Sequence, residues 1–412
     1  MLKKIDLNYI CTVLFVAALP LDFAFLSRGS GYRRSATEVD SEVILSNLFE
    51  VIIWSILYIF LAFRFLINIK KISFFYNQNL IFLAALIFLV LSLSVSLSID
   101  IYFLRGLNFY TWCLFVIMFF SLISLASSKD WQVIFNRLYK ILLFIIILNI
   151  LYFVFFPGNS LSSTGRLQGF FSNSNAFSRV AALFFIISIS NFKLKFFRIS
   201  YSVNTFTVFL ASMLIIGSGS ATTIVATAII SFVFFLQYLG IKQNFLYFVF
   251  IILLALGIYS LALLLSSDTL FSAIGRDASF TGRDIAWAYA IEYISSFNMF
   301  GYGLADTRYV FYNAYISSTN MHSNFLEFYF RTGALGSVVH IFFILMAGFR
   351  LFSPRKNIVM SYIFIFLFVS GLFNSIAFGI RGIDSLFYWM SLFYLASNIS
   401  ENIFSQTKGV NS

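Results

Sequence analysis

Long apolar runs without charge recur along the chain. The run from Ile81 to Leu97 has no charged residue and no proline, and the run from Ile141 to Phe156 is apolar on every side. About 20 apolar residues of helix cross a bilayer core, and a helix that is apolar all round faces lipid or a large core. The period of the runs is not two, which excludes a membrane β-barrel. The sequence therefore predicts a polytopic α-helical membrane protein.

Composition agrees with this prediction. Hydrophobic residues make up 60% of the 412 residues and charged residues only 10%, against about 45–50% and about 25% in soluble domains. These figures exclude a soluble domain, a disordered chain, collagen and a coiled coil. The net charge of +11 would suggest nucleic acid in a soluble protein, but here the charges lie between apolar runs and reflect topology. Cys11 and Cys113 lie inside such runs, so no disulfide framework is indicated.

Twelve transmembrane helices are predicted, with one long connection. The predicted spans are 8–26, 43–67, 79–99, 107–128, 133–156, 175–191, 201–217, 221–239, 245–265, 323–352, 357–376 and 386–402. We therefore divide the chain into helices 1–9 (residues 1–265), a large outer loop with short amphipathic helices (266–322), and helices 10–12 with a short cytoplasmic tail (323–412).

The distribution of lysine sets the predicted orientation. With the N-terminus inside and the spans alternating, all eleven lysines lie on the cytoplasmic side and every outer cation is an arginine. This follows the positive-inside rule and places both termini in the cytoplasm. Arginine binds phosphate groups in a bidentate manner, so the outer arginines suggest an anionic ligand. Pairing with outer acids is the alternative, the candidates being Asp268, Asp277, Asp284 and Asp306.

The long outer segment holds the candidate chemistry. Thr281 and Asp284 have capping-box spacing ahead of an amphipathic helix that contains Trp287, and residues 301–303 form a glycine-rich turn that we expect to be flexible. His322 lies at the predicted membrane boundary, and histidine suits proton transfer near neutral pH. The alternative role for His322 is that of a polar helix cap.

Other polar residues in the spans suggest structural roles. We expect His340 to be hydrogen-bonded between helices, and Glu327 and Arg331, four residues apart, to pair. Glu50, in the second span, is an intramembrane carboxylate and therefore a functional candidate, but its shallow position favours a structural role. The chain contains no nucleotide-binding fingerprint and no metal-ligand cluster, so no cofactor and no metal are predicted.

Four segments resemble the O-antigen ligase and polymerase superfamily. His322-Ser323, nine residues, Gly333, two residues and Gly336 resemble its histidine–glycine pattern, and 281–287 resembles its glycine–arginine helix. The turn 301–303 is similar to its G-x-G turn. The stretch 166–175, with Arg166, Gly169, Phe171 and two asparagines, resembles its R-x-x-G-x-F and N-x-N segment.

The resemblance implies a metal-independent, inverting glycosyltransferase at the periplasmic face of the bacterial inner membrane. The donor would be a glycan on undecaprenyl diphosphate within the lipid bilayer, and the acceptor would be a glycan or lipid A–core hydroxyl. A chain-length regulator protein would be a further partner, and nucleic acid would not. His322 would be the general base, and the residues that bind the diphosphate would be Arg283, Arg166, Arg276 and Arg308.

One departure from the pattern bears on the reaction. Ligases of the superfamily usually read S-x-S-R at the outer start of a span, whereas this chain has Ala221 after Ser218-Gly219-Ser220. A second arginine would then come from elsewhere, from Arg166 or Arg179. This difference favours a polymerase that joins lipid-linked repeat units, with an O-antigen ligase as the alternative. Protein O-oligosaccharyltransferases are a third interpretation. A lipid-linked oligosaccharide flippase is a further alternative. It would be expected to show internal repeats and mid-membrane charges, but the two halves of this sequence show no convincing repeat and the charges cluster at the outer edge.

Overall fold

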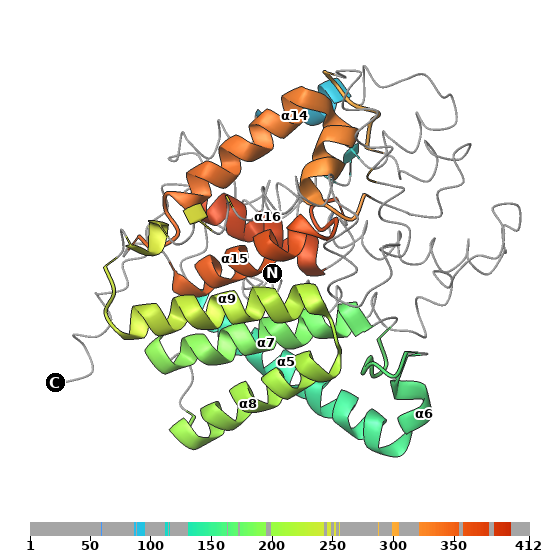
Figure 1. The fold of residues 1–412 in the computed structure, drawn as a ribbon, viewed down its shortest axis with the longest axis vertical. Coiled ribbons are helices and arrows are strands. Elements are labelled where there is room, and N and C mark those ends of the chain that lie inside the picture. Colours follow the sequence, from blue (N-terminus) through green and yellow to red (C-terminus); the bar gives the residue numbers. More distant parts are fainter. Residues whose placement is uncertain are drawn as a thin grey trace, which may run out of the picture.

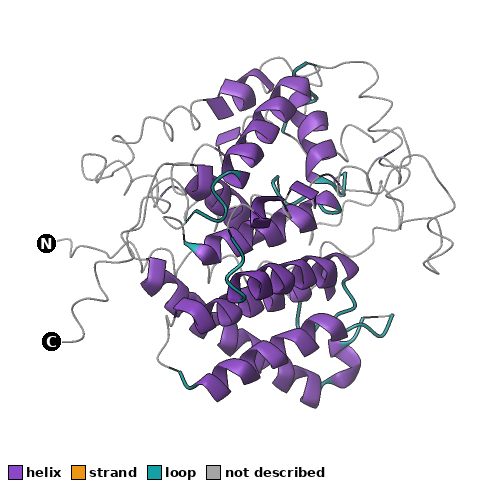
Figure 2. Ribbon diagram, turned by 60° about the vertical axis from the view of Figure 1, so that its left-hand side comes forward, coloured by secondary structure: helices purple, strands orange, loops and turns teal. Residues whose placement is uncertain are grey.

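A computed structural model describes about half of the chain. The described residues are 131–162, 164–171, 174–194, 199–242, 245–248, 299–304, 321–353, 357–378 and 383–396, with short pieces at 59, 86–87, 89–94, 112–113, 115, 251–252, 255 and 287. These parts are almost entirely helical and contain no strand (Figure 2). The prediction of a helical protein is confirmed for this portion.

Seven of the twelve predicted spans lie in the described portion as helices. They are α5 (Trp131–Phe155), α7 (Ser174–Leu194), α8 (Tyr201–Gly217), α9 (Ala221–Tyr238), α14 (Asn324–Gly348), α15 (Ile358–Leu372) and α16 (Ile383–Ala396), and a single turn, α6 (Pro157–Ser160), follows α5. The other predicted spans lie outside the described residues, apart from the short pieces named above.

Four of these helices are long and apolar enough to cross a membrane. They are α7, α9, α14 and most of α5, and α8 and α15 are shorter apolar helices. Together with the composition, they show a membrane protein.

The helices are arranged around α7 and α15. From top to bottom, Figure 1 shows α14, α16, α15, α9, α7 and α8, and α7 also contacts α5. Most side chains of α7 are buried, and its serines and alanines let neighbouring helices approach closely. The outer faces of α5, α8 and α9 carry large exposed apolar side chains such as Phe144, Phe206 and Phe232. The polar side chains of α7 are thus covered by the neighbouring helices, while the apolar faces of α5, α8 and α9 lie on the outside of the bundle.

The connections gather at two ends of the bundle. At one end, Asn374 Nδ2, after α15, donates to Thr222 Oγ1 in the first turn of α9 at 3.4 Å. At the other end, the Asn357 N–H donates to the Tyr394 hydroxyl at 3.0 Å, joining the start of α15 to the end of α16. Spans that alternate in direction place their connections at both ends of the bundle in this way.

Helix α14 is broken, which the prediction of a single span did not anticipate. Gly333 has φ 68° and ψ −165°, far from helical values. The two limbs of α14 meet at an angle in Figure 1. A backbone in this region is open almost exclusively to glycine, so Gly333 permits the break.

Candidate functional site

The start of α14, the turn after α15 and the start of α9 lie at one end of the bundle. His322 precedes the N-cap residue Ser323 of α14 and is half-buried. Its φ of 50° is the one positive value at a non-glycine residue in the described portion. Left-handed backbone is costly for a residue with a Cβ, so neighbouring contacts must hold it there.

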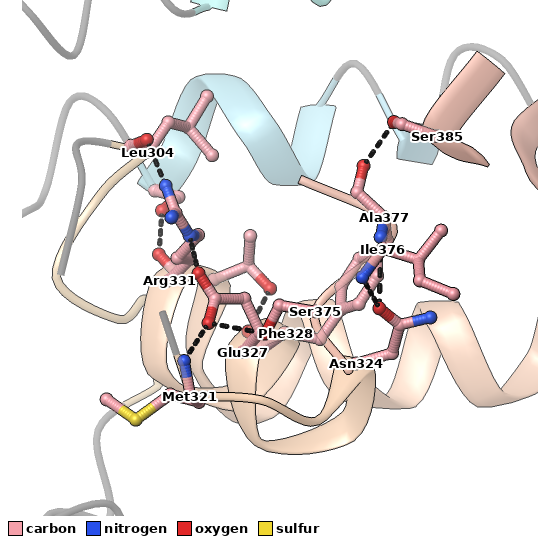
Figure 3. Close-up of polar contacts among 12 residues, drawn as sticks. Leu304, Met321, Asn324, Glu327, Phe328, Arg331, Ser375, Ile376, Ala377 and Ser385 are labelled. Carbon is pink, nitrogen blue, oxygen red and sulfur yellow. Dashed lines mark hydrogen bonds and ion pairs between the residues drawn. The ribbon is translucent and has the colours of Figure 1, made fainter. Parts of the chain in front are cut away.

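A buried ion pair lies one turn into α14 (Figure 3). Glu327 is fully buried and pairs with Arg331, as their spacing predicted. Arg331 binds Glu327 Oε1, and Glu327 Oε2 accepts hydrogen bonds from the Met321 N–H at 2.7 Å and the Ser375 hydroxyl at 3.0 Å. The Arg331 guanidinium also donates to the Leu304 carbonyl. The pair therefore joins the residue before His322 to the turn after α15 and to the loop at 304.

Asn324 makes a second link between α14 and the turn after α15. Its side-chain oxygen accepts hydrogen bonds from the Ile376 N–H at 2.6 Å and the Ala377 N–H at 2.9 Å (Figure 3). The Ala377 carbonyl in turn accepts from the Ser385 hydroxyl at 3.0 Å. Since these backbone groups are buried and outside a helix, the Asn324 side chain supplies the partner they need.

The two glycine motifs form one backbone contact. The N–H groups of Tyr302 and Gly303 donate to the carbonyls of Phe330 at 2.9 Å and Arg331 at 3.0 Å. A Cβ on Gly301 would lie 2.4 Å from the Arg331 carbonyl, and one on Gly333 would lie 2.4 Å from the Met299 carbonyl. Both glycines are buried, and they allow the turn 301–303 and the break in α14 to touch backbone to backbone.

Arg166 lies against the uncharged turn between α8 and α9. Its Nε donates to the Ser218 carbonyl at 2.8 Å and its Nη2 to Asn175 Oδ1 at 2.9 Å. The Leu167 N–H donates to the Gly217 carbonyl at 2.9 Å, which fixes the backbone beside the same turn. The guanidinium therefore lies against the turn that leads into Ala221, the position at which ligases of the superfamily usually carry an arginine.

The histidine–glycine motif and the uncharged turn both fall within a segment that a family comparison identifies. Residues 206–341 match the O-antigen ligase family. The match covers about one third of the chain and confirms the resemblance noted in the sequence. A comparison with curated proteins finds no match. Similarity to the O-antigen ligase family supports a glycosyltransferase-like membrane enzyme that acts on lipid-linked glycans.

Two further titratable residues within or near the segment that matches the O-antigen ligase family have structural partners. Arg179, in the second turn of α7, forms an ion pair with Asp384 in α16. His340 Nε2 lies 2.5 Å from the Tyr388 hydroxyl, and its ring stacks on Phe328 with a centroid distance of 3.6 Å. The predicted structural role of His340, bonded between helices, is confirmed. The carboxylate partner of Arg179 had no local sequence signal, since Asp384 is some 200 residues away.

Several predicted residues lie outside the described portion: Arg276, Arg283, Arg308, Glu50 and the four outer aspartates. Among the residues that are described, no group of three potential metal ligands occurs. Of the predicted site residues, the structure thus places His322 and Arg166, both at the end of the bundle where α9 and α14 begin.

Proposed function

We propose that the protein is a glycosyltransferase that moves a glycan from undecaprenyl diphosphate to an acceptor hydroxyl at the periplasmic face of the inner membrane. The observation that carries this proposal is His322 at the start of α14, inside the segment that matches the O-antigen ligase family. Under this proposal both termini are cytoplasmic and a chain-length regulator is a partner.

The chemistry requires one base and a site for the leaving diphosphate. His322 takes the proton from the acceptor hydroxyl, whose oxygen attacks the anomeric carbon of the donor with inversion. The bond between that carbon and the diphosphate oxygen breaks, and undecaprenyl diphosphate leaves with the bonding electron pair. Arg283 and Arg166 stabilise its charge, with Arg276 and Arg308 as further ligands. The diphosphate linkage supplies the driving force, so no metal or nucleotide is needed.

Polymerisation of lipid-linked repeat units is the reaction we favour. The α8–α9 turn, 218–220, carries no charge, and Arg166 is bound beside it. In our proposal Arg166 supplies the positive charge that Ala221 lacks. The second candidate is ligation to lipid A–core, because the matched family bears the description O-antigen ligase.

Deleting the gene in its own host separates these two reactions. If polymer formation depends on the protein, the surface glycan on a gel loses its long ladder and keeps a single attached repeat. If ligation depends on it, all attached glycan disappears and long polymer remains on the lipid carrier.

Point variants then test the site. We expect His322→Ala to abolish glycan formation and Arg166→Ala to reduce it strongly, with both proteins still present in the membrane. Lys242→Ala removes an exposed cation after α9, at the opposite end of the bundle, and serves as the charge control. Wild-type glycan with His322→Ala would remove the catalytic assignment.

A purified enzyme assay distinguishes transfer from transport. We expect full-length protein in detergent to lengthen or release lipid-linked glycan extracted from the deletion strain. A flippase has no such activity in detergent, because no membrane separates two compartments there.

A further inference from the structure

We propose that Glu327 and Trp287 are positioning residues that hold the Met321 peptide units and thereby orient His322. This inference rests on the proposed role of His322 as general base. It concerns two side chains that the proposed reaction does not otherwise use, and it starts from the strained backbone at His322.

Met321 is held on both of its backbone groups by side chains. Its N–H donates to Glu327 Oε2 at 2.7 Å, and its carbonyl accepts from Trp287 Nε1 at 2.6 Å. All of Met321 is buried, and so is Trp287. Because the Met321 carbonyl belongs to the peptide bond that leads into His322, the indole fixes the plane from which the histidine projects.

The residue after His322 is held by the first backbone hydrogen bond of α14. The Glu327 N–H donates to the Ser323 carbonyl at 2.9 Å, so Glu327 binds one flank of His322 with its side chain and the other with its backbone. With both flanks fixed, the φ of 50° at His322 is imposed by its surroundings. This arrangement sets the direction of the histidine side chain through its backbone.

Burial assigns Glu327 a positioning role and excludes a catalytic one. Its side chain is fully buried, and its two oxygens already bind Met321, Ser375 and Arg331. A substrate hydroxyl cannot reach this carboxylate.

Trp287 links His322 to the segment that carries Arg283. The two residues are four positions apart in the sequence, and Trp287 is helical. The indole-to-Met321 bond therefore connects the stretch that contains the predicted diphosphate ligand with the residue next to the base. Since the bond is made to Met321, next to His322, and not to Arg283 itself, its loss is expected to affect the chemical step more than donor binding.

The test compares two conservative variants of the full-length protein in detergent, with lipid-linked glycan extracted from the deletion strain as substrate. Trp287→Phe removes the bond to Met321 and keeps a large apolar ring. Tyr388→Phe is the matched control, because it removes one buried hydrogen bond to α14 at His340, away from Met321. We expect Trp287→Phe to lower kcat about tenfold or more with KM nearly unchanged, and Tyr388→Phe to retain the wild-type kcat.

A double variant tests Glu327 separately. Glu327→Leu with Arg331→Met removes both charges and the acceptor for the Met321 N–H, and we expect a loss of kcat of about tenfold or more at an equal amount of folded protein. A wild-type kcat in this variant, or in Trp287→Phe, overturns the proposal. If the double variant does not fold, Trp287→Phe decides alone.

His322→Ala in the same assay separates this proposal from the proposed function. An inactive His322→Ala protein beside fully active Trp287→Phe and double variants refutes positioning only. A fully active His322→Ala protein refutes the role of His322 as base.

Discussion

The contact between Gly301 and Gly333 predicts a large effect for one added methyl group. In Gly333→Ala the new Cβ would lie 2.4 Å from the Met299 carbonyl carbon and oxygen and 2.5 Å from the Phe300 nitrogen. These are backbone atoms, which cannot rotate away as a flexible side chain would. The φ of 68° and ψ of −165° add strain for any residue with a Cβ.

The two effects can be estimated and separated. Strained backbone costs about 1–3 kcal/mol, and overpacking costs a further amount of about 1–3 kcal/mol. Gly240→Ala is the control, since Gly240 has a φ of 73° but an added methyl group there would have nothing within 4 Å. It therefore reports the cost of a Cβ at a positive φ without overlap. Gly333→Ala adds the overlap and the ψ of −165°, and we expect it to be less stable than this control by about 2 kcal/mol.

The measurement is the fraction of protein that stays monodisperse on size-exclusion chromatography after heating in detergent. We expect Gly333→Ala to lose this fraction at a lower temperature than Gly240→Ala, and both at or below the wild-type temperature. Equal stability of the two variants would refute the reasoning, because it would mean that the Met299–Gly333 contact opens at no cost.

Three further outcomes follow from the described contacts. Asn324→Ala leaves the buried N–H groups of Ile376 and Ala377 without their acceptor, and we expect about 2–4 kcal/mol of destabilisation in the same heating assay; wild-type stability would contradict this. Asp384→Asn leaves the Arg179 guanidinium without its carboxylate, and we expect about 3 kcal/mol of destabilisation; no change would mean that solvent already screens the pair. Transferase activity should persist in excess EDTA because the base and the cations are side chains, and its loss would indicate a metal.

The candidate site was only partly accessible from the sequence. The motif at His322 and the stretch at Arg166 were both identified by their resemblance to the O-antigen ligase and polymerase superfamily, and the pairing of Glu327 with Arg331 followed from one turn of helix. The contact of Glu327 with Met321 could not be predicted from the sequence. The pairing with Arg331 already accounts for the carboxylate, and no sequence pattern indicates that it also folds back over the start of the helix.

The sequence by itself determined that this is a helical membrane protein, and in the part of the chain that the structure describes it located the seven long helices to within about six residues at each end. It located α8, for example, at residues 201–217. The length of an apolar run and its lack of charge are local properties. Inside a bilayer the backbone of such a run must satisfy its own hydrogen bonds, and it therefore forms a helix.

Only the tertiary structure decided which distant groups meet. The break at Gly333, its contact with Gly301, and Arg166 against a turn 52 residues away all depend on the packing of separate helices. Hydropathy carries no information about these pairings, because the sequence around a glycine or an arginine is the same whichever backbone that residue contacts. The physical reason is that a close backbone contact or a buried charge involves two separate helices or loops, and each buried polar group must find its partner on the neighbouring element.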